Sequence, residues 1–362
     1  MTKLILVGGF LGSGKTTLLA EAAKKLTAEQ QSVGLITNDQ APELVDTRLL
    51  SRVGKGVLEV AGSCFCCNFN GFADAVQSLI TRGAETIIAE PVGSCTDLSA
   101  TILNPVKKFH PDWNLAPLTV LVDPNRFFEI VGVTTSQVDP DALYIMKLQM
   151  DEADRILINK SDTLSDSEKT KIQDLLKKEF PEKATGLISA KTGDGIDAWL
   201  KEIRTAKDVG TKIVPVDYDR YAHGEAVLGW LNATATVQAK NNQVNGHTLL
   251  KNLLEDFQTE IKKSSSEVGH VKAILNVGGK ESVANLTSLN GIVEVRDIET
   301  ISDKPVLIFN ARVQMSPESL EKLVRQLFAG NISRQLDVKI ETLRCLMPGR
   351  PNPTHRFNKT EN

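Results

Sequence analysis

In the first part of the chain, as far as Ile188, short apolar runs alternate with stretches whose apolar residues recur at helical spacing. Strand-length apolar runs separated by helices are typical of a mostly parallel β-sheet covered by helices on both faces. The pattern therefore predicts an α/β fold for this region. The predicted strands are Leu4–Val7, Val33–Ile36, Val57–Val60, Thr86–Ala89, Leu118–Val122, Arg155–Ile158 and Gly186–Ile188.

The order of the predicted elements changes after residue 224. There the predicted strands are Ala226–Gln238, His270–Val277, Gly291–Ile298, Pro305–Val313 and Val338–Leu346, and the predicted helices are His247–Ser264 and Pro317–Phe328. This order favours a smaller α+β domain with one antiparallel sheet and helices on one face. We predict a first domain over 1–210, a linker over 211–224, a second domain over 225–347 and a basic, proline-containing mobile tail over 348–362.

A glycine-rich run lies between the first predicted strand and a helical stretch. It reads Gly9-Phe10-Leu11-Gly12-Ser13-Gly14-Lys15-Thr16 and fits G-x-x-x-x-G-K-[ST] in the strand–loop–helix context that this motif requires. Its backbone N–H groups are expected to surround a phosphate chain. Lys15, also a catalytic candidate, is expected to reach the β- and γ-phosphates, and the Thr16 hydroxyl to bind Mg²⁺. The predicted nucleotide contacts here are Gly9, Gly12, Ser13, Gly14, Lys15, Thr16 and Thr17.

Two later segments indicate which base the nucleotide carries. The Arg155–Ile158 strand leads into an N-K-x-D sequence, and an S-A-K sequence follows the Gly186–Ile188 run. A carboxylate at Asp162 can accept hydrogen bonds from guanine N1 and N2, a donor pair that adenine lacks, and the Ala190 amide can meet guanine O6. We therefore predict GTP as the ligand. The predicted base contacts are Asn159, Lys160, Asp162, Ser189, Ala190 and Lys191.

Three of the five cysteines lie within four residues, at Cys64, Cys66 and Cys67. Since the longest apolar stretches have only strand length, we expect a cytoplasmic protein without membrane spans, where clustered thiols indicate metal binding or redox chemistry rather than disulfides. Thiolates favour Zn²⁺, Cu(I) or related ions over Mg²⁺. Metal binding is the favoured interpretation, and buried packing thiols or a redox switch are the alternatives. Three sulfurs do not complete a tetrahedron.

Taken together, these motifs resemble those of the CobW family of metal-linked P-loop GTPases, which are relatives of UreG and HypB. The family's G-F-L-G-x-G-K-T-T-L-L is similar to Gly9–Leu19, and its G-C-x-C-C is similar to Ser63–Cys67. Its Asn-Glu switch segment corresponds to Asn38-Asp39, and its E-x-x-G element to Glu90–Gly93. The stretch Gln149–Asp154 is similar too.

The sequence departs from the family pattern at two places. Asp39 replaces a glutamate and is followed by Gln40-Ala41-Pro42, and Ser63 replaces a glycine. Asp39 and Glu90 remain the candidates for positioning Mg²⁺ or water, with Glu90 expected in the Mg²⁺ shell. Cys95, just after the E-x-x-G element, lies where it could approach the other thiols, although a buried packing role is the favoured interpretation.

The resemblance implies a GTP-hydrolysing metallochaperone or metalloenzyme-maturation factor that couples GTP to a transition metal, Zn²⁺ or Co²⁺, at Cys64, Cys66 and Cys67. Its implied partner is a client apo-metalloprotein or a corrinoid- or metal-dependent enzyme. The alternative is a regulatory or client-activating GTPase with a structural zinc or no carried metal. Because Ser94 stands where a catalytic glutamine would follow Gly93, we expect slow intrinsic hydrolysis.

The composition argues against two kinds of site, one that binds nucleic acid and one built from histidines. A net charge of −3, a pI near 6.0 and an aromatic content of 5% argue against a nucleic-acid partner. The five histidines are scattered, and we expect surface or capping roles for them, with His110 the first exception to consider. For the second domain we expect client binding or the formation of a homodimer, and a purely structural lid is the alternative.

Overall fold

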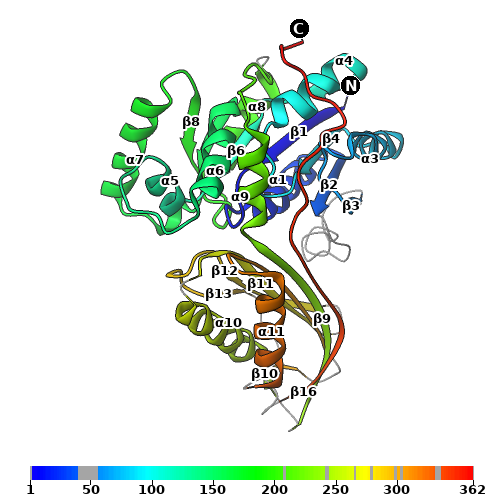
Figure 1. Cartoon of the computed structure of the whole chain (residues 1–362). Coiled ribbons are helices and arrows are strands. Elements are labelled where there is room, and N and C mark those ends of the chain that lie inside the picture. Colours follow the sequence, from blue (N-terminus) through cyan, green and yellow to red (C-terminus); the bar gives the residue numbers. More distant parts are fainter. Residues whose placement is uncertain are drawn as a thin grey trace. The chain divides into compact units, whose positions relative to one another are not determined.

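The computed structural model describes residues 2–39, 56–206, 209–240, 244–264, 266–277, 280–296, 300–301, 305–330 and 336–361. The chain forms two compact units (Figure 1). The first comprises Met1–Ser136, Pro140–Tyr221 and Arg350–Asn362, and the second comprises Gln137–Asp139 and Ala222–Gly349. The first unit therefore contains both the start and the end of the chain.

The first unit is built on a parallel sheet with the strand order β3-β2-β4-β1-β6-β7-β8, in which β5 also pairs with β1. These strands are β1 (Lys3–Gly8), β2 (Val33–Asp39), β3 (Val57–Ala61), β4 (Thr86–Glu90), β5 (Asn114–Leu115), β6 (Thr119–Val122), β7 (Arg155–Ile158) and β8 (Ala184–Leu187). Every strand predicted for this region is present, and among its described residues only the two-residue β5 was not predicted. The α/β prediction is confirmed.

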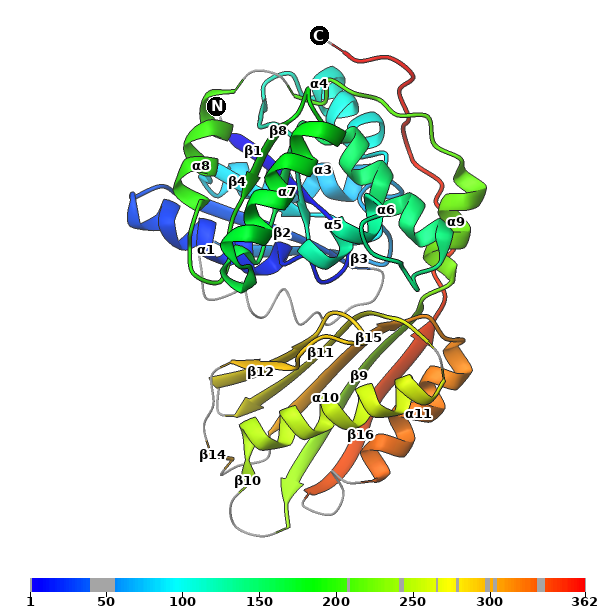
Figure 2. The same cartoon turned by 90° about the vertical axis from the view of Figure 1, so that its left-hand side faces the viewer.

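Helices flank this sheet (Figure 2). They are α1 (Lys15–Ala28), α3 (Phe69–Thr81), α4 (Asn104–Phe109), α5 (Pro124–Ile130), α6 (Pro140–Glu152), α7 (Asp166–Glu179) and α8 (Ile196–Thr205). Leu18 and Leu19 of α1 and Trp199 of α8 are buried in one cluster with Ile5 and Val7 of β1. This cluster fixes α1, and with it the glycine-rich loop that precedes it, on the sheet.

The second unit is an antiparallel sheet with the order β13-β12-β11-β15-β9-β16, and a separate pair joins β10 to β14. Its elements are β9 (Gly229–Ala239), β10 (Val244–Asn245), α10 (Gly246–Lys263), β11 (Val268–Val277), β12 (Lys280–Leu286), β13 (Glu294–Arg296), β14 (Thr300–Ile301), β15 (Val306–Val313), α11 (Pro317–Ala329) and β16 (Leu336–Leu346). Phe257 of α10 and Phe328 of α11 both contact Phe309 of β15. Both helices thus cover the same face (Figure 2), as the predicted α+β fold requires.

Two regions differ from the predicted elements. The residues expected to form a linker over 211–224 include most of helix α9 (Tyr218–Ala226). The predicted strand over Gly291–Ile298 is present only as the short β13, while β12 was not predicted. The polar sequence of β12 carries no long apolar run, and its strand conformation comes from pairing with β11. The exact domain boundaries stay a prediction.

The end of the chain, for which the sequence predicts a mobile tail, makes specific hydrogen bonds with the first unit. Residues 350–361 run along the first unit and bond to it. The Thr354 N–H donates to the Cys66 carbonyl oxygen at 2.8 Å, and Arg356 Nε donates to Asp97 Oδ2 at 2.7 Å. Because these partners lie far away in the sequence, the composition of the tail does not reveal the contacts.

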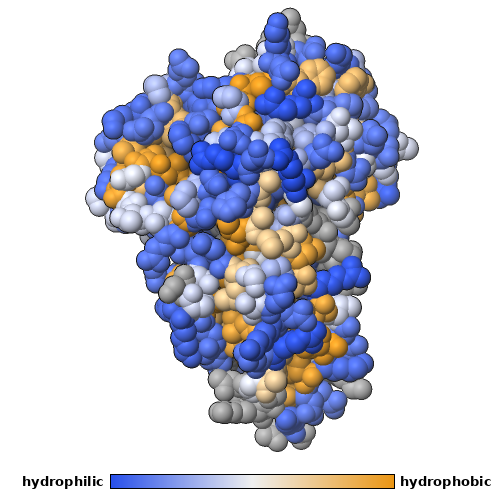
Figure 3. All heavy atoms as spheres, viewed as in Figure 1, coloured by the Kyte–Doolittle hydropathy of each residue, from blue (hydrophilic) through white to orange (hydrophobic). Residues whose placement is uncertain are grey.

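Most of the surface in Figure 3 is hydrophilic, with hydrophobic residues in separate groups. Among the described residues, the large hydrophobic side chains that remain exposed are those of Phe109, Val133, Ile292 and Met347. No helix in the described part of the chain is both long and apolar enough to cross a membrane.

A buried carboxyl group, Glu152 at the end of α6, holds the segment that follows β4. Its oxygens accept hydrogen bonds from the Thr96 hydroxyl and the Ser99 N–H, each at 2.9 Å. Burial raises the pKa of Glu152 to about 8, because the charged form loses its hydration. Glu152 is therefore protonated in the folded protein over a range of pH where it would be ionised in the unfolded chain.

We predict that Glu152→Gln reduces the pH dependence of stability. Since the pKa of Glu152 is higher in the folded state, the wild type should lose stability as pH rises from about 4.5 to about 8, by at most about 1.4 kcal/mol per pH unit. Thermal unfolding of the full chain between pH 5 and 8 measures this slope. Glu179→Gln, at the exposed end of α7, is the control. An unchanged slope in Glu152→Gln would contradict the assignment.

Candidate functional site

The glycine-rich loop connects β1 to α1 with a backbone that requires glycine. Gly9, Gly12 and Gly14 all have positive φ, at 130°, 76° and 94°. A Cβ at Gly14 would lie 2.2 Å from Asn159 Nδ2, so a larger residue would disturb a neighbouring loop as well. The Ser13 hydroxyl is buried and has no hydrogen-bond partner among the described residues, so it offers an unused donor to a phosphate.

Lys15, Thr16 and Glu90 lie together at the start of α1. Lys15 Nζ donates to the carbonyl oxygens of Gly9 and Phe10, at 2.8 and 3.3 Å, and lies 3.9 Å from Glu90 Oε1. The Thr16 hydroxyl donates to Glu90 Oε1 at 3.2 Å. Adjacent ligands of an octahedral Mg²⁺ lie about 3 Å apart, so this pair fits the ion. Thr17 follows in the first turn of α1.

The two predicted base-contacting segments meet each other and the glycine-rich loop. Asn159 Nδ2 donates to the Ser13 carbonyl oxygen at 2.7 Å, and Asn159 Oδ1 accepts the Ala190 N–H at 2.9 Å. The Ser189 hydroxyl donates to Asp162 Oδ1 at 2.6 Å. This arrangement brings the N-K-x-D and S-A-K segments to one side of the phosphate loop.

The remaining members of these segments are less enclosed. Lys160 has a left-handed backbone, with φ of 59°, and its ammonium pairs with Asp123 at 2.7 Å. The Asp162 and Lys191 side chains are exposed and accessible to a ligand. The predicted contact between the Ala190 amide and guanine stays a prediction, since that amide donates to Asn159 in this structure.

The three clustered cysteines form a tight turn between β3 and α3. The Cys64 carbonyl oxygen accepts the N–H groups of Cys67 and Asn68, at 3.1 and 3.0 Å. Asn68 then begins α3, because its side-chain oxygen accepts the Gly71 N–H at 3.0 Å. The local sequence thus places all three thiols in the turn before a helix N-terminus, where the helix dipole favours the thiolate form.

The sulfur atoms of Cys64, Cys66 and Cys67 lie within 4.8 Å of one another. The Cys64 and Cys66 sulfurs are 2.9 Å apart, and those of Cys66 and Cys67 are 3.9 Å apart. Hydrogen bonds from the neighbouring thiols lower the pKa of Cys64, and the bond from Cys66 has the largest effect. The pKa of Cys66 is raised for the complementary reason, since its thiol donates to Cys64. One thiolate in this cluster is therefore stabilised by the others.

Asn38 connects the cysteine turn to the end of β2. Its side-chain nitrogen donates to the carbonyl oxygens of Val60 and Ser63, each at 2.7 Å, and its side-chain oxygen accepts the Phe65 N–H at 2.8 Å. The sequence placed Asn38 in a switch segment but did not reveal these three bonds. Asp39 ends β2, and its side chain and residues 40–42 lie outside the described part of the structure.

The tail also contacts the cysteine turn, which the sequence did not indicate. The Asn352 N–H donates to Cys67 Sγ at 3.3 Å, and the Thr354 hydroxyl donates to the Cys67 carbonyl oxygen at 3.1 Å. His110 stacks on Trp113 with ring centroids 4.0 Å apart. Within the described residues, the group that gathers potential metal ligands here contains cysteines and no histidine.

Comparison with known proteins places this nucleotide site in a family. The family model described as CobW/HypB/UreG, nucleotide-binding domain, matches residues 3–185. The chain belongs to the CobW/HypB/UreG family. The matched region contains the phosphate loop, the cysteine turn, Glu90 and the N-K-x-D segment, so the resemblance seen in the motifs is confirmed.

Individual relatives match this CobW/HypB/UreG protein at low sequence identity. The zinc chaperone YeiR of Escherichia coli (strain K12) is 29% identical over 166 residues, which are 45% of this chain and 47% of the relative. The chain thus matches about half the length of that protein. Among solved structures, Helicobacter pylori HypB in complex with nickel has a TM-score of 0.41 and 18% identity, covering 57% of this chain and 92% of HypB. Zn(II)-bound YjiA GTPase from E. coli has a TM-score of 0.37 and 16% identity, covering 91% and 98%.

We predict that Gly14→Ala weakens nucleotide binding at least about tenfold, because its Cβ would displace Asn159 from the loop. Gly83→Ala is the matched control: Gly83 has a similar φ of 82°, but open space surrounds its Cβ position. Both variants should lose about 1 kcal/mol of stability from the left-handed backbone. Titration with a fluorescent guanine nucleotide, alongside thermal unfolding, separates the two effects. Equal nucleotide affinity in both variants would contradict the prediction.

Proposed function

We propose that this protein is a GTP-hydrolysing metallochaperone that binds a transition metal, preferably Zn²⁺, at Cys64, Cys66 and Cys67 and releases it according to its nucleotide state. The observation that carries the proposal is the convergence of three thiols in a turn that Asn38 ties to the strand next to Glu90. The proposed metal site and the nucleotide site therefore lie at the ends of neighbouring strands.

The residues of the nucleotide site favour a guanine nucleotide bound with Mg²⁺. The exposed carboxylate of Asp162 has one oxygen engaged by Ser189 and presents acceptors that match guanine N1 and N2. Lys15, Ser13 and the loop N–H groups supply donors for the phosphates. Thr16 and Glu90 would hold Mg²⁺, which neutralises charge on the phosphates when bound.

Hydrolysis in this proposal relies on positioning. Lys15 orients and neutralises the terminal phosphates, and Glu90 holds the metal shell or the attacking water. In the loop after Glu90, Ser94 occupies the place of a water-orienting glutamine, and we therefore expect slow turnover without a partner. Asp39 stays a second candidate for positioning Mg²⁺ or water.

Contacts between the two sites provide a physical route for coupling. Thr37 of β2 pairs with Glu90 of β4, and the next residue is Asn38, which holds the cysteine turn. Gly93 packs so closely on the phosphate loop that a Cβ there would lie 2.8 Å from the Leu11 side chain. A displacement of the β2 or β4 end on nucleotide exchange must therefore move the cysteine turn or the Gly93 loop.

The thiol ligands favour Zn²⁺ over Co²⁺ by affinity, although availability in the cell also decides which ion is bound. The similarity to the zinc chaperone YeiR supports zinc as the cargo. The recipient in this proposal is an apo-metalloprotein or a corrinoid- or metal-dependent enzyme, and the second unit is the candidate surface for that client or for a homodimer.

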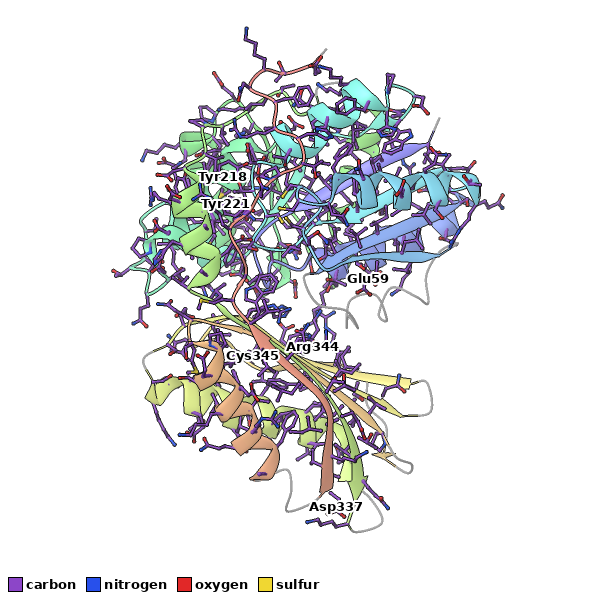
Figure 4. All side chains as sticks on the ribbon, turned by 45° about the vertical axis from the view of Figure 1, so that its right-hand side comes forward. Glu59, Tyr218, Tyr221, Asp337, Arg344 and Cys345 are labelled. Atoms are coloured by element: carbon purple, nitrogen blue, oxygen red, sulfur yellow. The ribbon has the colours of Figure 1, made fainter. Side chains whose placement is uncertain are left out.

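We expect zinc affinity to depend on the nucleotide. Chelator competition under anaerobic conditions, with GDP or with a non-hydrolysable GTP analogue, should show at least a tenfold higher affinity with the analogue, a coupling of about 1.4 kcal/mol. Cys66→Ala should abolish tight binding. Cys345→Ala is the matched control, because Cys345 lies on β16 of the second unit (Figure 4).

The other possible outcomes of these measurements distinguish the alternative functions. Equal zinc affinity in both nucleotide states would contradict GTP-gated release. If, in addition, metal removal unfolds the protein, the zinc is structural. If client-stimulated GTP hydrolysis survives the loss of Cys66 and Cys67, the protein is a client-activating GTPase that carries no metal.

We predict that Asp162→Asn lowers GTP affinity at least about tenfold, because a hydrogen bond to a charged acceptor contributes about 1.5–3 kcal/mol. The asparagine amide can instead donate to the C2 carbonyl of xanthine, so the affinity for xanthosine triphosphate should rise. Competition binding with the two nucleotides measures the preference, and Asp166→Asn at the exposed start of α7 is the control. An unchanged preference for GTP would remove Asp162 from the base site.

A further inference from the structure

The three clustered thiols differ in how easily another molecule can reach them. Cys64 and Cys66 are 6% and 1% exposed, whereas Cys67 is partly exposed. Exchange at a thiol requires that the incoming group reaches the sulfur atom, so its rate depends on access. Within this group, Cys67 is therefore the thiol that an incoming ligand or reagent reaches first, and the residues that lie over it control exchange.

The tail, residues 350–361, lies over Cys67, and Figure 1 shows it in red along the first unit. The Asn352 N–H donates to Cys67 Sγ at 3.3 Å, and the Thr354 hydroxyl donates to the Cys67 carbonyl oxygen at 3.1 Å. The Thr354 N–H donates to the Cys66 carbonyl oxygen at 2.8 Å. The tail therefore contacts both the most accessible sulfur atom of the group and the backbone of the turn.

A buried carboxyl group anchors this tail. Arg356 Nε donates to Asp97 Oδ2 at 2.7 Å, and the Tyr218 hydroxyl donates to the same oxygen at 2.8 Å. Figure 4 shows Tyr218 on α9. Asp97 is 1% exposed, and a buried charge that loses its partner is strongly destabilised. Arg356 therefore holds the tail more firmly than the solvent-exposed hydrogen bonds around Cys67 do.

Aromatic rings attach the tail at a second place. The His355 ring contacts Phe69 of α3 and Phe109 of α4, with ring centroids 5.2 and 4.9 Å apart, respectively. The Phe357 ring contacts Phe109 as well, at 6.2 Å. Because α3 begins directly after the cysteine turn, these ring contacts hold the tail beside that turn.

We propose that the tail is a strap that shields the cysteine turn: Arg356 anchors it on Asp97, and it covers Cys67 until it is displaced. This inference adds regulation to the function proposed above and, for metal transfer, rests on metal binding at the turn. A client that takes the metal must displace the strap before its own ligand can reach Cys67. The shielding itself requires no metal and can be tested on the metal-free protein.

Alkylation of the reduced, metal-free full chain with iodoacetamide, followed by mass spectrometry, measures access to Cys67. Arg356→Ala should speed its modification at least tenfold, because a hydrogen bond to a charged group shifts an opening equilibrium by that much or more. Lys359→Ala, which removes an exposed positive charge from the same tail, is the matched control. Cys345 on β16 is the internal reference, and its rate should not change. An unchanged Cys67 rate in folded Arg356→Ala would overturn the proposal.

Phe109→Ala gives a second test, which decides if Arg356→Ala does not fold, as the binding of a fluorescent guanine nucleotide reports. Phe109 is 47% exposed, and its removal loosens the tail without leaving Asp97 unpaired. Modification of Cys67 should rise about fivefold, because two ring contacts are lost. Val133→Ala, which shortens another exposed apolar side chain of the first unit, is the control.

Hydrogen exchange of the Thr354 and Phe357 amides reports whether the tail has been released, because both amides donate to the first unit in the closed state. Amide exchange and Cys67 modification should rise together in Arg356→Ala and Phe109→Ala. Faster amide exchange with an unchanged Cys67 rate would show that the tail does not shield the thiol, and would overturn the proposal.

Zinc transfer connects the strap to the proposed function. Zinc-loaded Arg356→Ala should pass zinc to a chromophoric chelator at least tenfold faster than the wild type and Lys359→Ala, since it opens more often. Equal transfer rates in a variant with a released tail would overturn the role of the strap and leave the proposed metallochaperone intact. A wild type that binds no zinc would overturn the metallochaperone, and alkylation of the metal-free protein would still decide whether the tail shields Cys67.

Discussion

The parallel pairing of β2 with β4, which sets Thr37 opposite Glu90, is the constraint on which the whole site depends. Parallel strands end at the same edge of a sheet, so the segments that follow them become neighbours. β1 leads into the phosphate loop, β2 ends in Asn38-Asp39, β3 leads into the cysteine turn, and β4 ends at Glu90. The candidate phosphate, Mg²⁺ and transition-metal ligands thus gather at one edge because of topology, before any side chain has a specific role.

Buried amide side chains then fix the loops at this edge of the sheet by hydrogen bonds. Asn38 donates to two carbonyl oxygens of the cysteine segment, and Gln149 donates to two in the Cys95 loop. Each unmade bond of this kind costs about 1–3 kcal/mol when the group stays buried. We therefore expect loops held in this way to exchange one fully bonded packing for another rather than deform gradually, which is the behaviour that a nucleotide switch needs.

The elements that could be predicted from the sequence are those with a local signal. Apolar runs predicted the parallel strands, and the glycine, N-K-x-D and cysteine motifs located the segments that meet around the phosphate loop and the thiol cluster. The contacts of the tail lacked such a signal. Thr354 and Arg356 bond to Cys66 and Asp97, whose positions relative to the tail exist only in the folded chain.

A site that carries metal must bind it tightly and yet open, and the two requirements fall on different parts of this fold. In the proposed function, thiolates around zinc would make spontaneous loss slow, so release would depend on moving a ligand. Asn38, next to Thr37 of β2, holds the cysteine turn from the side of the nucleotide site, whereas Cys67 accepts hydrogen bonds from Asn352 and Thr354 of the tail. A client that lifted the tail would remove those bonds from Cys67 and leave the hydrogen bonds of Asn38 in place. In the proposed function, nucleotide and client would therefore act on the cysteine turn through separate contacts, and their effects on metal affinity must be thermodynamically reciprocal.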